Sequence, residues 1–483
     1  MNKRNIMAVI FAVLTAGACS GSNYNIPILN AQDSAFKNKL PIPPVLKPVE
    51  ENNISRYTLQ VQQGNYEFIK GEMVYTYGYN GPILGPTIKV KRGQKVSIEV
   101  QNLLREFTTV HWHGMLVPGD MDGGPHQVIS PGKKWTASFT VNQPAATAWY
   151  HPHGLGTTAR QVYMGLAGLF IVEDEISDKL NIPREYGVND IPLIVQDKRL
   201  SEEGVPLYLT GMRDIMVGML GNTILVNGVI TPHLTVTKNK YRLRILNGSN
   251  ARVYNFSFND NSPFFIIATD GGFLEKPVKR KNIILSPGER IEIIADFSKY
   301  SDGRNVKLVS GNIDIMEFRV NGIEKETAII PERLANINGY DPSSSKRARL
   351  FQLEGMGHMV AINGRKMNIN RIDEYMNYND TEIWTITSST AMHGRGMMGG
   401  GMMGRMGPDV LHNFHAHGVH FLILSRNGIP PGEHEKGWKD TVLLNENEEV
   451  KVITRFLYRG IFMYHCHILE HEDNGMMGQF KVK

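Results

Sequence analysis

The chain contains, at residues 85–102, the stretch GPTIKVKRGQKVSIEVQN, in which apolar and polar residues alternate on both sides of a charged turn. This alternation is typical of two β-strands joined by a short turn. The pattern returns twice, as PHLTVTKNKYRLRILNGS at 232–249 and as MNINRIDEYMNYNDTEIWTITSS at 367–389. Because each copy predicts the same structural unit, the repeat constrains the whole fold.

A further strand signal follows each copy, at SPGKKWTASFTV (130–141), LSPGERIEIIADF (285–297) and NENEEVKVITRFL (445–457). Long helical periods are scarce. We therefore expect an all-β protein of three related domains, each a Greek-key β-sandwich or barrel. Their approximate boundaries are 50–178, 188–325 and 345–483.

Length and composition agree with this organisation. The chain has 483 residues, which suggests about three domains at roughly 150 residues each. Its 48 glycines and 24 prolines indicate many turns. A charge balance of 52 − 47 = +5, without a strong run of either sign, argues against nucleic-acid binding. The two cysteines, Cys19 and Cys466, cannot form a disulfide framework.

The first residues have the pattern of a secretory signal. Lys3 and Arg4 precede an apolar run at 6–14, and Ala16 and Ala18 suit cleavage after residue 18. We therefore expect a signal peptide at 1–18 and export to the periplasm. Lipid attachment at Cys19 is a less favoured alternative. The apolar run is shorter than the roughly 20 residues of a membrane span, and no later segment reaches that length.

Paired histidines distinguish the first and third units from the second. They occur in VHWHG (110–114), WYHPHG (149–154), FHAHG (414–418) and MYHCH (463–467). Residues two apart on a strand face the same side, roughly 7 Å apart, so each pair presents two imidazoles to one place. Eight imidazoles suit two or three ions, and imidazole favours Cu, Zn, Fe or Ni. The duplication predicts a metal cluster between the two units.

A cysteine stands between the last two histidines. By strand alternation, Cys466 faces away from His465 and His467, towards the interior of its own domain. His412, His471 and Met476 are close in sequence to these strands. One thiolate, two imidazoles and a distant thioether match a blue-copper site with a weak axial Met. The alternatives are a buried apolar cysteine and a zinc site, but no Glu stands in the H-E-x-x-H position.

These blocks, HWHG, HPHG, HNFHAHG and HCHILEHEDNGM, resemble those of multicopper oxidases over nearly all of residues 50–483. The bacterial three-domain periplasmic cuprous oxidases, which are laccase-like, are the most similar group. The resemblance implies three cupredoxin-like domains and four copper ions. It assigns a type 1 copper to His412, Cys466, His471 and Met476, a type 2 copper to His111 and His415, and a binuclear type 3 site to His113, His151, His153, His417, His465 and His467. One departure is Asn413, where the family usually has Pro, and we expect it to alter loop stiffness more than ligation.

The resemblance also implies a reaction. The type 1 copper would take electrons singly from a donor, and the three-copper cluster would return four of them to dioxygen, giving water. Asp122 and Glu472 match acidic positions that the family uses for proton delivery. The alternative for Asp122 is that it caps a Gly-Gly turn. An axial Met476 suggests a lower potential than an apolar residue there would give, so strong phenol oxidation is less expected.

The segment AMHGRGMMGGGMMGRMGPD at 391–409 has no helical or strand period. Methionine normally fills cores, but a Gly-rich run without a periodic face has no core to fill, and thioethers prefer Cu(I). We expect a Cu(I)-gathering segment over the type 1 copper; the alternative is a passive loop. The candidate residues for substrate Cu(I) are Met356, Met359, Met392, Met397, Met398, Met402, Met403, Met406 and Asp409.

We therefore expect a monomeric cuprous oxidase for copper tolerance, with Cu(I) and O2 as substrates. The alternative within enzymes is a laccase acting on phenols or aromatic amines. The alternative from another class is a non-catalytic periplasmic protein that sequesters copper.

Overall fold

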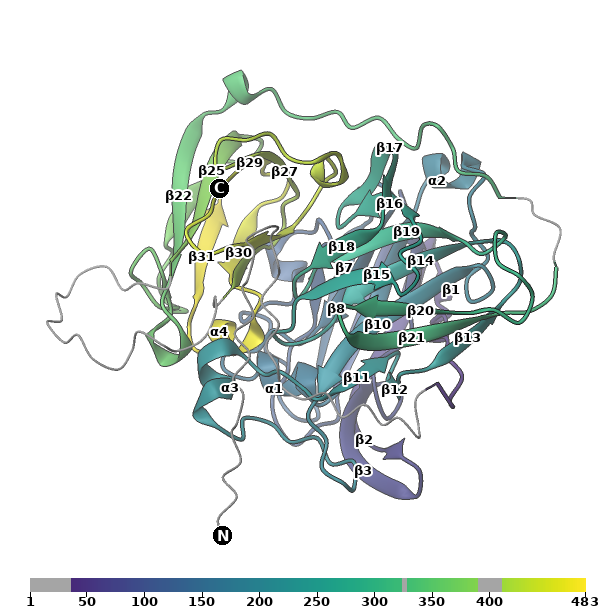
Figure 1. The fold of residues 1–483 in the computed structure, drawn as a ribbon. Coiled ribbons are helices and arrows are strands. Elements are labelled where there is room, and N and C mark those ends of the chain that lie inside the picture. Colours follow the sequence, from purple (N-terminus) through teal and green to yellow (C-terminus); the bar gives the residue numbers. More distant parts are fainter. Residues whose placement is uncertain (1–35, 324–327, 390–410) are drawn as a thin grey trace, which may run out of the picture.

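The computed structural model describes residues 36–323, 328–389 and 411–483. The predictions for 1–18, for Cys19 and for the methionine-rich segment 391–409, including Asp409, concern residues outside these ranges. Strands dominate the described chain and its helices are short, which confirms the predicted all-β class. Figure 1 shows three strand-rich bodies, coloured purple to blue, teal, and green to yellow along the sequence.

The first domain is a sandwich of two sheets. One sheet runs β1-β2-β5-β7, with β3 paired to β2, and the other runs β4-β9-β8-β6. Apolar side chains such as Val61, Ile98 and Trp112 pack between them. The strands are β1 (Val49–Glu51), β2 (Ile54–Ile69), β3 (Glu72–Tyr79), β4 (Ile88–Lys91), β5 (Lys95–Asn102), β6 (His111–His113), β7 (Lys134–Thr140), β8 (Ala146–His151) and β9 (Gly168–Glu173).

The second domain pairs a seven-stranded sheet, β12-β11-β10-β14-β19-β16-β17, with a five-stranded sheet, β13-β21-β20-β15-β18. Its core includes Leu243, Phe256 and Ile293. The strands are β10 (Asp190–Lys198), β11 (Thr223–Val226), β12 (Val229–Ile230), β13 (His233–Val236), β14 (Lys240–Asn247), β15 (Tyr254–Phe258), β16 (Phe264–Thr269), β17 (Gly272–Arg280), β18 (Asn282–Leu285), β19 (Arg290–Asp296), β20 (Asn305–Ser310) and β21 (Ile313–Val320).

The third domain has two five-stranded sheets, β23-β22-β25-β29-β27 and β24-β31-β30-β26-β28. Cys466 and Met476 belong to its core, together with Trp384 and Phe414. The strands are β22 (Arg347–Glu354), β23 (Ala361–Ile362), β24 (Glu374–Met376), β25 (Thr381–Ser389), β26 (His412–Ala416), β27 (Phe421–Arg426), β28 (Thr441–Leu444), β29 (Glu449–Arg455), β30 (Gly460–His465) and β31 (Met477–Val482).

The sequence repeat corresponds to a repeated crossing between sheets. In each copy the first strand lies in one sheet and the second in the opposite sheet, as β4 to β5, β13 to β14 and β24 to β25. Each of these strands also has a parallel partner, for example β9 for β4 and β2 for β5. Gly93 and Asn379 have positive φ in the first and third turns, where the chain reverses sharply. The two strands of a copy are therefore not a hairpin, although both strands were predicted.

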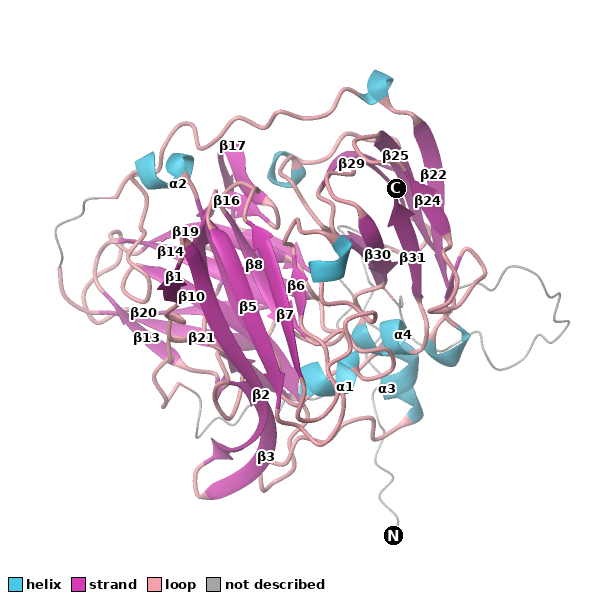
Figure 2. Cartoon of the chain, turned by 180° about the vertical axis from the view of Figure 1, so that it is seen from behind, coloured by secondary structure: helices cyan, strands magenta, loops and turns pink. Residues whose placement is uncertain are grey.

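Three short helices gather where the three domains meet. The α-helices are α1 (Thr158–Tyr163), α2 (Glu175–Lys179), α3 (Met212–Val217) and α4 (Leu469–Asp473), and the 3-10 turns are η1 (Gly119–Met121), η2 (Pro342–Ser344), η3 (Gly357–Met359) and η4 (Glu433–Glu435). Helices α1, α3 and α4 come from different domains and lie side by side in both views (Figures 1 and 2). Across 36–323, 328–389 and 411–483, no helix has both the length and the apolar character needed to cross a membrane.

Candidate metal centres

The histidine pairs lie on neighbouring strands, or directly after their ends, in both domains that carry them. In the first domain β6 pairs antiparallel with β8, which sets His111 opposite His151. In the third domain β26 pairs with β30, which sets His415 opposite His465. The two domains therefore present the same arrangement of two facing His-x-His pairs.

The structure brings all eight predicted histidines together. Every one is buried, with at most 1% of its surface exposed. Their ring nitrogens form three groups, and within each group the nitrogens lie no more than 4.8 Å apart. The groups are His111 with His415 and His417, His113 with His151 and His467, and His153 with His417 and His465.

Rings from the two domains stack on each other in two matching pairs. The centroids of His111 and His417 lie 3.7 Å apart with 16° between the ring planes. Those of His113 and His415 also lie 3.7 Å apart, with 10° between the planes. The cluster thus lies on the contact between the first and third domains, and neither domain holds it alone.

Fixed oxygen acceptors orient these imidazoles. His111 Nδ1 donates to the carbonyl oxygen of Asp122 at 2.9 Å, and His415 Nδ1 donates to that of Asp440 at 2.8 Å. The Nε2 atoms of both rings then face inward, and no hydrogen-bond partner for either is found in the described part of the chain. Both nitrogens of His467 are in the same situation. Buried polar atoms rarely stay unpaired, so this histidine cluster fits metal ions bound through imidazole nitrogen.

Both predicted acidic residues touch the histidine cluster. Asp122 Oδ2 lies 2.7 Å from His417 Nδ1, so its side chain reaches across the domain contact and does more than end a turn. Glu472 Oε2 lies 3.2 Å from His465 Nδ1. Burial by itself would raise the pKa of Glu472, but the neighbouring His153 and His465 lower it to about 2.

Two further residues belong to the cluster and were missed from the sequence. The carboxylate of Asp440 accepts from His113 Nε2 at 3.1 Å, and Arg290 of the second domain holds that carboxylate through both of its terminal nitrogens. Neither residue stands in a metal-ligand motif. Arg290 is 150 residues from Asp440 and meets it only through tertiary folding, so no local pattern joins the two. The second domain therefore takes part in the site although it carries no histidine pair.

The second candidate centre is built around Cys466. Its Sγ lies 3.7 Å from His412 Nδ1 and 4.0 Å from His471 Nδ1. Met476 is fully buried in the same core, and its carbonyl oxygen accepts from the backbone N–H of Cys466. Burial lowers the pKa of His412 to about 3 and that of His471 to about 4, so both rings are neutral near pH 7. Neutral imidazoles with a thiol and a thioether are a donor set that fits copper.

The two centres are directly adjacent along the chain. Cys466 belongs to the second centre, and His465 and His467 on either side of it belong to two different groups of the cluster. A covalent path through a single peptide bond therefore joins Cys466 to a histidine of each group.

Several of the described methionines belong to or adjoin α3 and η3, the elements that pack on α4, the helix that carries His471. Met356 directly precedes η3 and Met359 is its last residue, and η3 packs on α3 and α4. Met216 of α3 was not predicted, yet its Sδ packs against Gly357 of η3, and its carbonyl oxygen accepts from His471 Nε2 at 3.0 Å. The sequence gives no signal for Met216, because α3 belongs to the domain without predicted ligands.

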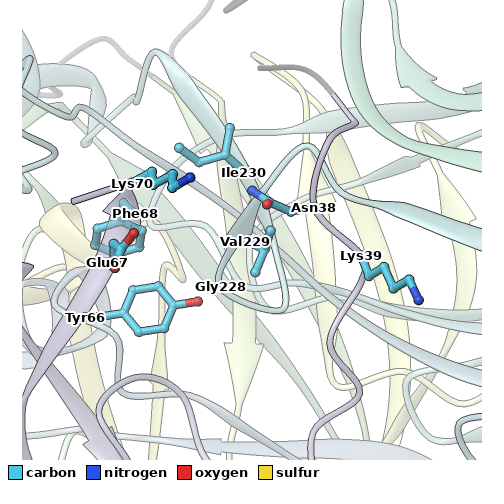
Figure 3. Close-up of a pocket in the computed structure, with 9 residues that line it drawn as sticks. All are labelled: Asn38, Lys39, Tyr66, Glu67, Phe68, Lys70, Gly228, Val229 and Ile230. Atoms are coloured by element: carbon cyan, nitrogen blue, oxygen red, sulfur yellow. The ribbon is translucent and has the colours of Figure 1, made fainter. Parts of the chain in front are cut away.

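A pocket of about 580 Å³ lies away from both centres. It is formed by the N-terminal segment at Lys39, by β2 at Tyr66 and by the turn at Gly228 (Figure 3). None of the candidate ligands lines it, so its size carries no argument for the chemistry of this chain.

Three family models, each described as multicopper oxidase, match residues 60–177, 202–314 and 341–483. "Multicopper oxidase mco" of Staphylococcus aureus is 43% identical over 454 residues, which is 94% of either chain. "Cell division protein FtsP" of Escherichia coli (strain K12) is 34% identical over 488 residues, covering 96% of both. The crystal structure of a laccase from Pediococcus acidilactici superposes with a TM-score of 0.84 at 38% identity, over 93% of this chain and 95% of that one.

Proposed function

The chain belongs to the multicopper oxidase family, and from this premise we propose that it oxidises Cu(I) to Cu(II) and reduces dioxygen to water. Family membership makes it an oxidase that uses copper and takes oxygen as the electron acceptor. The balanced reaction is 4 Cu(I) + O2 + 4 H⁺ → 4 Cu(II) + 2 H2O. The observation that carries the choice of Cu(I) is the presence of methionines in α3 and around η3, the two elements that pack on the helix of His471.

Twelve side chains would hold four copper ions. His412, Cys466, His471 and Met476 would hold the type 1 ion, His111 and His415 the type 2 ion, and His113, His151, His153, His417, His465 and His467 the type 3 pair. When bound, the coppers supply the redox chemistry, in which one centre accepts single electrons and a cluster of three passes four electrons to dioxygen. The unpaired inward-facing nitrogens of the described histidines support this assignment.

Two acidic side chains beside the histidine cluster can transfer protons to it. Asp122 accepts from His417 Nδ1 through Oδ2, whereas its Oδ1 is buried and has no hydrogen-bond partner in the part of the protein described here. A proton held on Oδ1 would therefore lie within the cluster and out of bulk water. Glu472 holds the corresponding position at His465. We propose that these two carboxyl groups relay from solvent the protons that oxygen reduction consumes. Glu472, whose pKa the neighbouring histidines lower to about 2, would take up each proton as a carboxylate and pass it on.

Methionines of α3 and η3 lie on the elements that pack on α4, the helix of His471. Met359 is 48% exposed and Met212, at the start of α3, is 69% exposed, so both can meet an ion from solvent. Met216 lies further in, and its own carbonyl oxygen bonds the ring of His471. Soft sulfur ligands select Cu(I) over harder ions. We propose that Met356 and Met359, together with these residues of α3 and with Met392, Met397, Met398, Met402, Met403, Met406 and Asp409, receive the substrate ion.

A second candidate activity is oxidation of phenols or aromatic amines, as in a laccase. The observation in its favour is the 0.84 TM-score to a protein that is itself called a laccase. The two activities differ at the entry to the type 1 site, because a bulky organic donor needs open access to His471 whereas Cu(I) needs thioethers. We further propose export to the periplasm, a monomeric state and a role in copper tolerance.

Oxygen consumption tests the proposal. Copper-loaded protein given Cu(I) should consume oxygen well above the copper-only background. A chain that lacks residues 394–406 should lose Cu(I) turnover and keep or increase the oxidation of a bulky phenol. No oxygen uptake with Cu(I) would contradict the cuprous activity and would favour a copper-sequestering role, and an equal fall in both activities would contradict the role of the methionine segment.

A further inference from the structure

The second domain reaches the histidine cluster through the turn at residues 286–289, which joins β18 to β19. Turns normally lie at the surface of a protein, but every residue of this turn is buried. Within the second domain, the N–H of Gly288 donates to the carbonyl oxygen of Asn247 at 2.9 Å, and Ser286 Oγ donates to Glu289 Oε2 at 2.8 Å. Breaking buried hydrogen bonds is costly, so the tip of the turn is a firm surface.

Hydrogen bonds also fasten this turn to the third domain. Asn413 Nδ2 donates to the carbonyl oxygen of Pro287 at 2.8 Å and to Ser286 Oγ at 3.1 Å. Arg290, which is ion-paired with the third domain, donates from Nη1 to the carbonyl oxygen of Gly288 at 3.0 Å. Contacts on both sides of Gly288 therefore fix its position relative to the third domain.

The tip of the turn packs against a ring of the cluster. A Cβ atom added at Gly288 would lie 3.0 Å from Cδ2 of His467 and 3.1 Å from both Cγ and Nε2. Three neighbouring ring atoms at nearly equal distances place the glycine against the face of the imidazole. The φ of Gly288 is +84°, a conformation that residues with a Cβ rarely adopt. The close approach and the backbone conformation therefore both require glycine here.

Packing orients the ring of His467. A metal-binding histidine almost always donates its second N–H to a fixed acceptor, as His111 does to a carbonyl oxygen. Neither ring nitrogen of His467 has such a partner among the described residues. The rings of His113 and His151 meet it edge to face, with centroids 5.0 and 5.3 Å away. The face that lies against Gly288 is therefore the side on which the backbone itself limits the angle of the ring.

We propose that Gly288 is a positioning residue of the histidine cluster, which sets the angle of the His467 ring by direct contact with its face. At this angle a ring nitrogen of His467 lies within 4.8 Å of those of His113 and His151. The domain without histidine pairs thereby completes one ion-binding position of the cluster. This inference rests on the proposed function, because it presumes that copper binds at these three histidines.

The test compares Gly288→Ala with Gly303→Ala in the full-length protein. Gly303 also belongs to the second domain and has a φ of +79°, but a Cβ atom there would meet no described atom within 4 Å. Both variants carry similar backbone strain, and only Gly288→Ala presses on His467. Copper added to the copper-free protein should bind about 10–100-fold more weakly at one position in Gly288→Ala, with the blue absorption of the Cys466 centre retained. Gly303→Ala should match the unmodified protein, and equal copper affinities in the two variants would overturn the inference.

Removal of the ring keeps the inference testable if Gly288→Ala does not fold. Gly288→Ala combined with His467→Ala leaves no imidazole for the added Cβ to meet. In a double-mutant cycle, its unfolding temperature should match that of Gly303→Ala combined with His467→Ala. A lower unfolding temperature for the double variant with Gly288→Ala would overturn the inference. An unmodified protein that binds no copper would contradict the proposed function instead, and the unfolding temperatures of the copper-free chains would still show whether Gly288 holds the ring.

Discussion

Arg290 of the second domain holds Asp440 of the third in a two-point contact, with Nη1 2.8 Å from Oδ1 and Nη2 2.6 Å from Oδ2. Both side chains are essentially inaccessible to solvent. Asp440 in turn accepts from His113 through its carboxylate and from His415 through its carbonyl. The domain without histidine pairs therefore orients one imidazole from each of the other two domains. Asp122 makes the matching contacts to His111 and His417, but through a carboxylate whose second oxygen has no partner among the described residues.

Arg290→Met should disrupt the histidine cluster. It leaves the buried Asp440 charge without its cation, and breaking a buried ion pair in this way costs about 3–5 kcal/mol. Losing an outer partner of a metal-binding histidine weakens metal affinity by about 10–100-fold. Thermal unfolding and copper binding to the copper-free protein measure the two effects. Arg290→Lys keeps the charge but not the two-point geometry, so its thermal stability and copper affinity should lie between those of Arg290→Met and the unmodified protein. Unaltered copper affinity in both variants would show that Asp440 is positioned without Arg290.

Asp122→Asn should slow oxygen reduction while leaving the Cys466 centre intact. The amide cannot hold an exchangeable acid proton beside His417, and loss of a positioned acid or base typically costs about 10²–10⁴-fold in rate. Steady-state oxygen uptake should fall on that scale, with the blue absorption unchanged. Asp120→Asn is the matched control, because Asp120 is exposed two residues away. Equal rates in the two variants would remove Asp122 from proton delivery.

Met216→Leu combined with Met356→Leu should raise the KM for Cu(I) and leave phenol oxidation unchanged. Leucine keeps the volume and removes the soft ligand, so packing of α3 on η3 is largely preserved. Initial rates at varied concentrations of Cu(I) and of a phenol measure the two KM values. Met73→Leu is the control, because Met73 is an exposed residue of strand β3. A double variant whose Cu(I) kinetics match those of the control would place the substrate ion elsewhere.

Glu292 should make the protein lose stability in acid. It binds Arg242 and Arg244 and accepts from Thr147 of the first domain. Burial would raise its pKa, but the two arginines lower it to about 2. A carboxyl group titrates near 4.3 in the unfolded chain. The contacts of ionised Glu292 with its two arginines therefore stabilise the folded protein above about pH 4.5, and this stabilisation is lost as the pH falls towards 2. The contribution is on the order of 3 kcal/mol.

Denaturant unfolding between pH 5 and pH 2 tests this dependence on Glu292. Glu292→Gln should be less stable at neutral pH and should lose less stability on acidification than the unmodified protein. Glu99→Gln removes an exposed carboxylate and should follow the unmodified curve. Parallel curves for Glu292→Gln and the unmodified protein would assign the acid sensitivity to other groups.

Much of the architecture could be predicted because its causes are local. Alternation identified β4 and β5, and His-x-His spacing on strands gave the eight histidines, since residues two apart must share a face. Alternation does not predict which sheet each strand joins. The turn at Gly93 could close a hairpin or cross between sheets with the same sequence, and packing against β9 and β2 decides it.

The residues missed at the centres act across long distances in sequence. Arg290 and Met216 belong to the second domain, where no ligand motif marks them, and both meet the site only after the domains pack together. Asn413 departs from the family pattern in the sequence itself. Its hydrogen-bond partners Ser286 and Pro287 are more than 120 residues away, so the sequence around Asn413 does not indicate them. Local pattern therefore predicts the candidate ligands and leaves out the residues that orient them.

Elemental analysis of the purified, copper-supplied protein tests the central claim most directly. Two joined centres with the ligands described here predict four copper ions per chain, falling to about three in Cys466→Ser with loss of the blue colour. Zinc in place of copper, or a copper content well below four despite ample supply, would contradict the account.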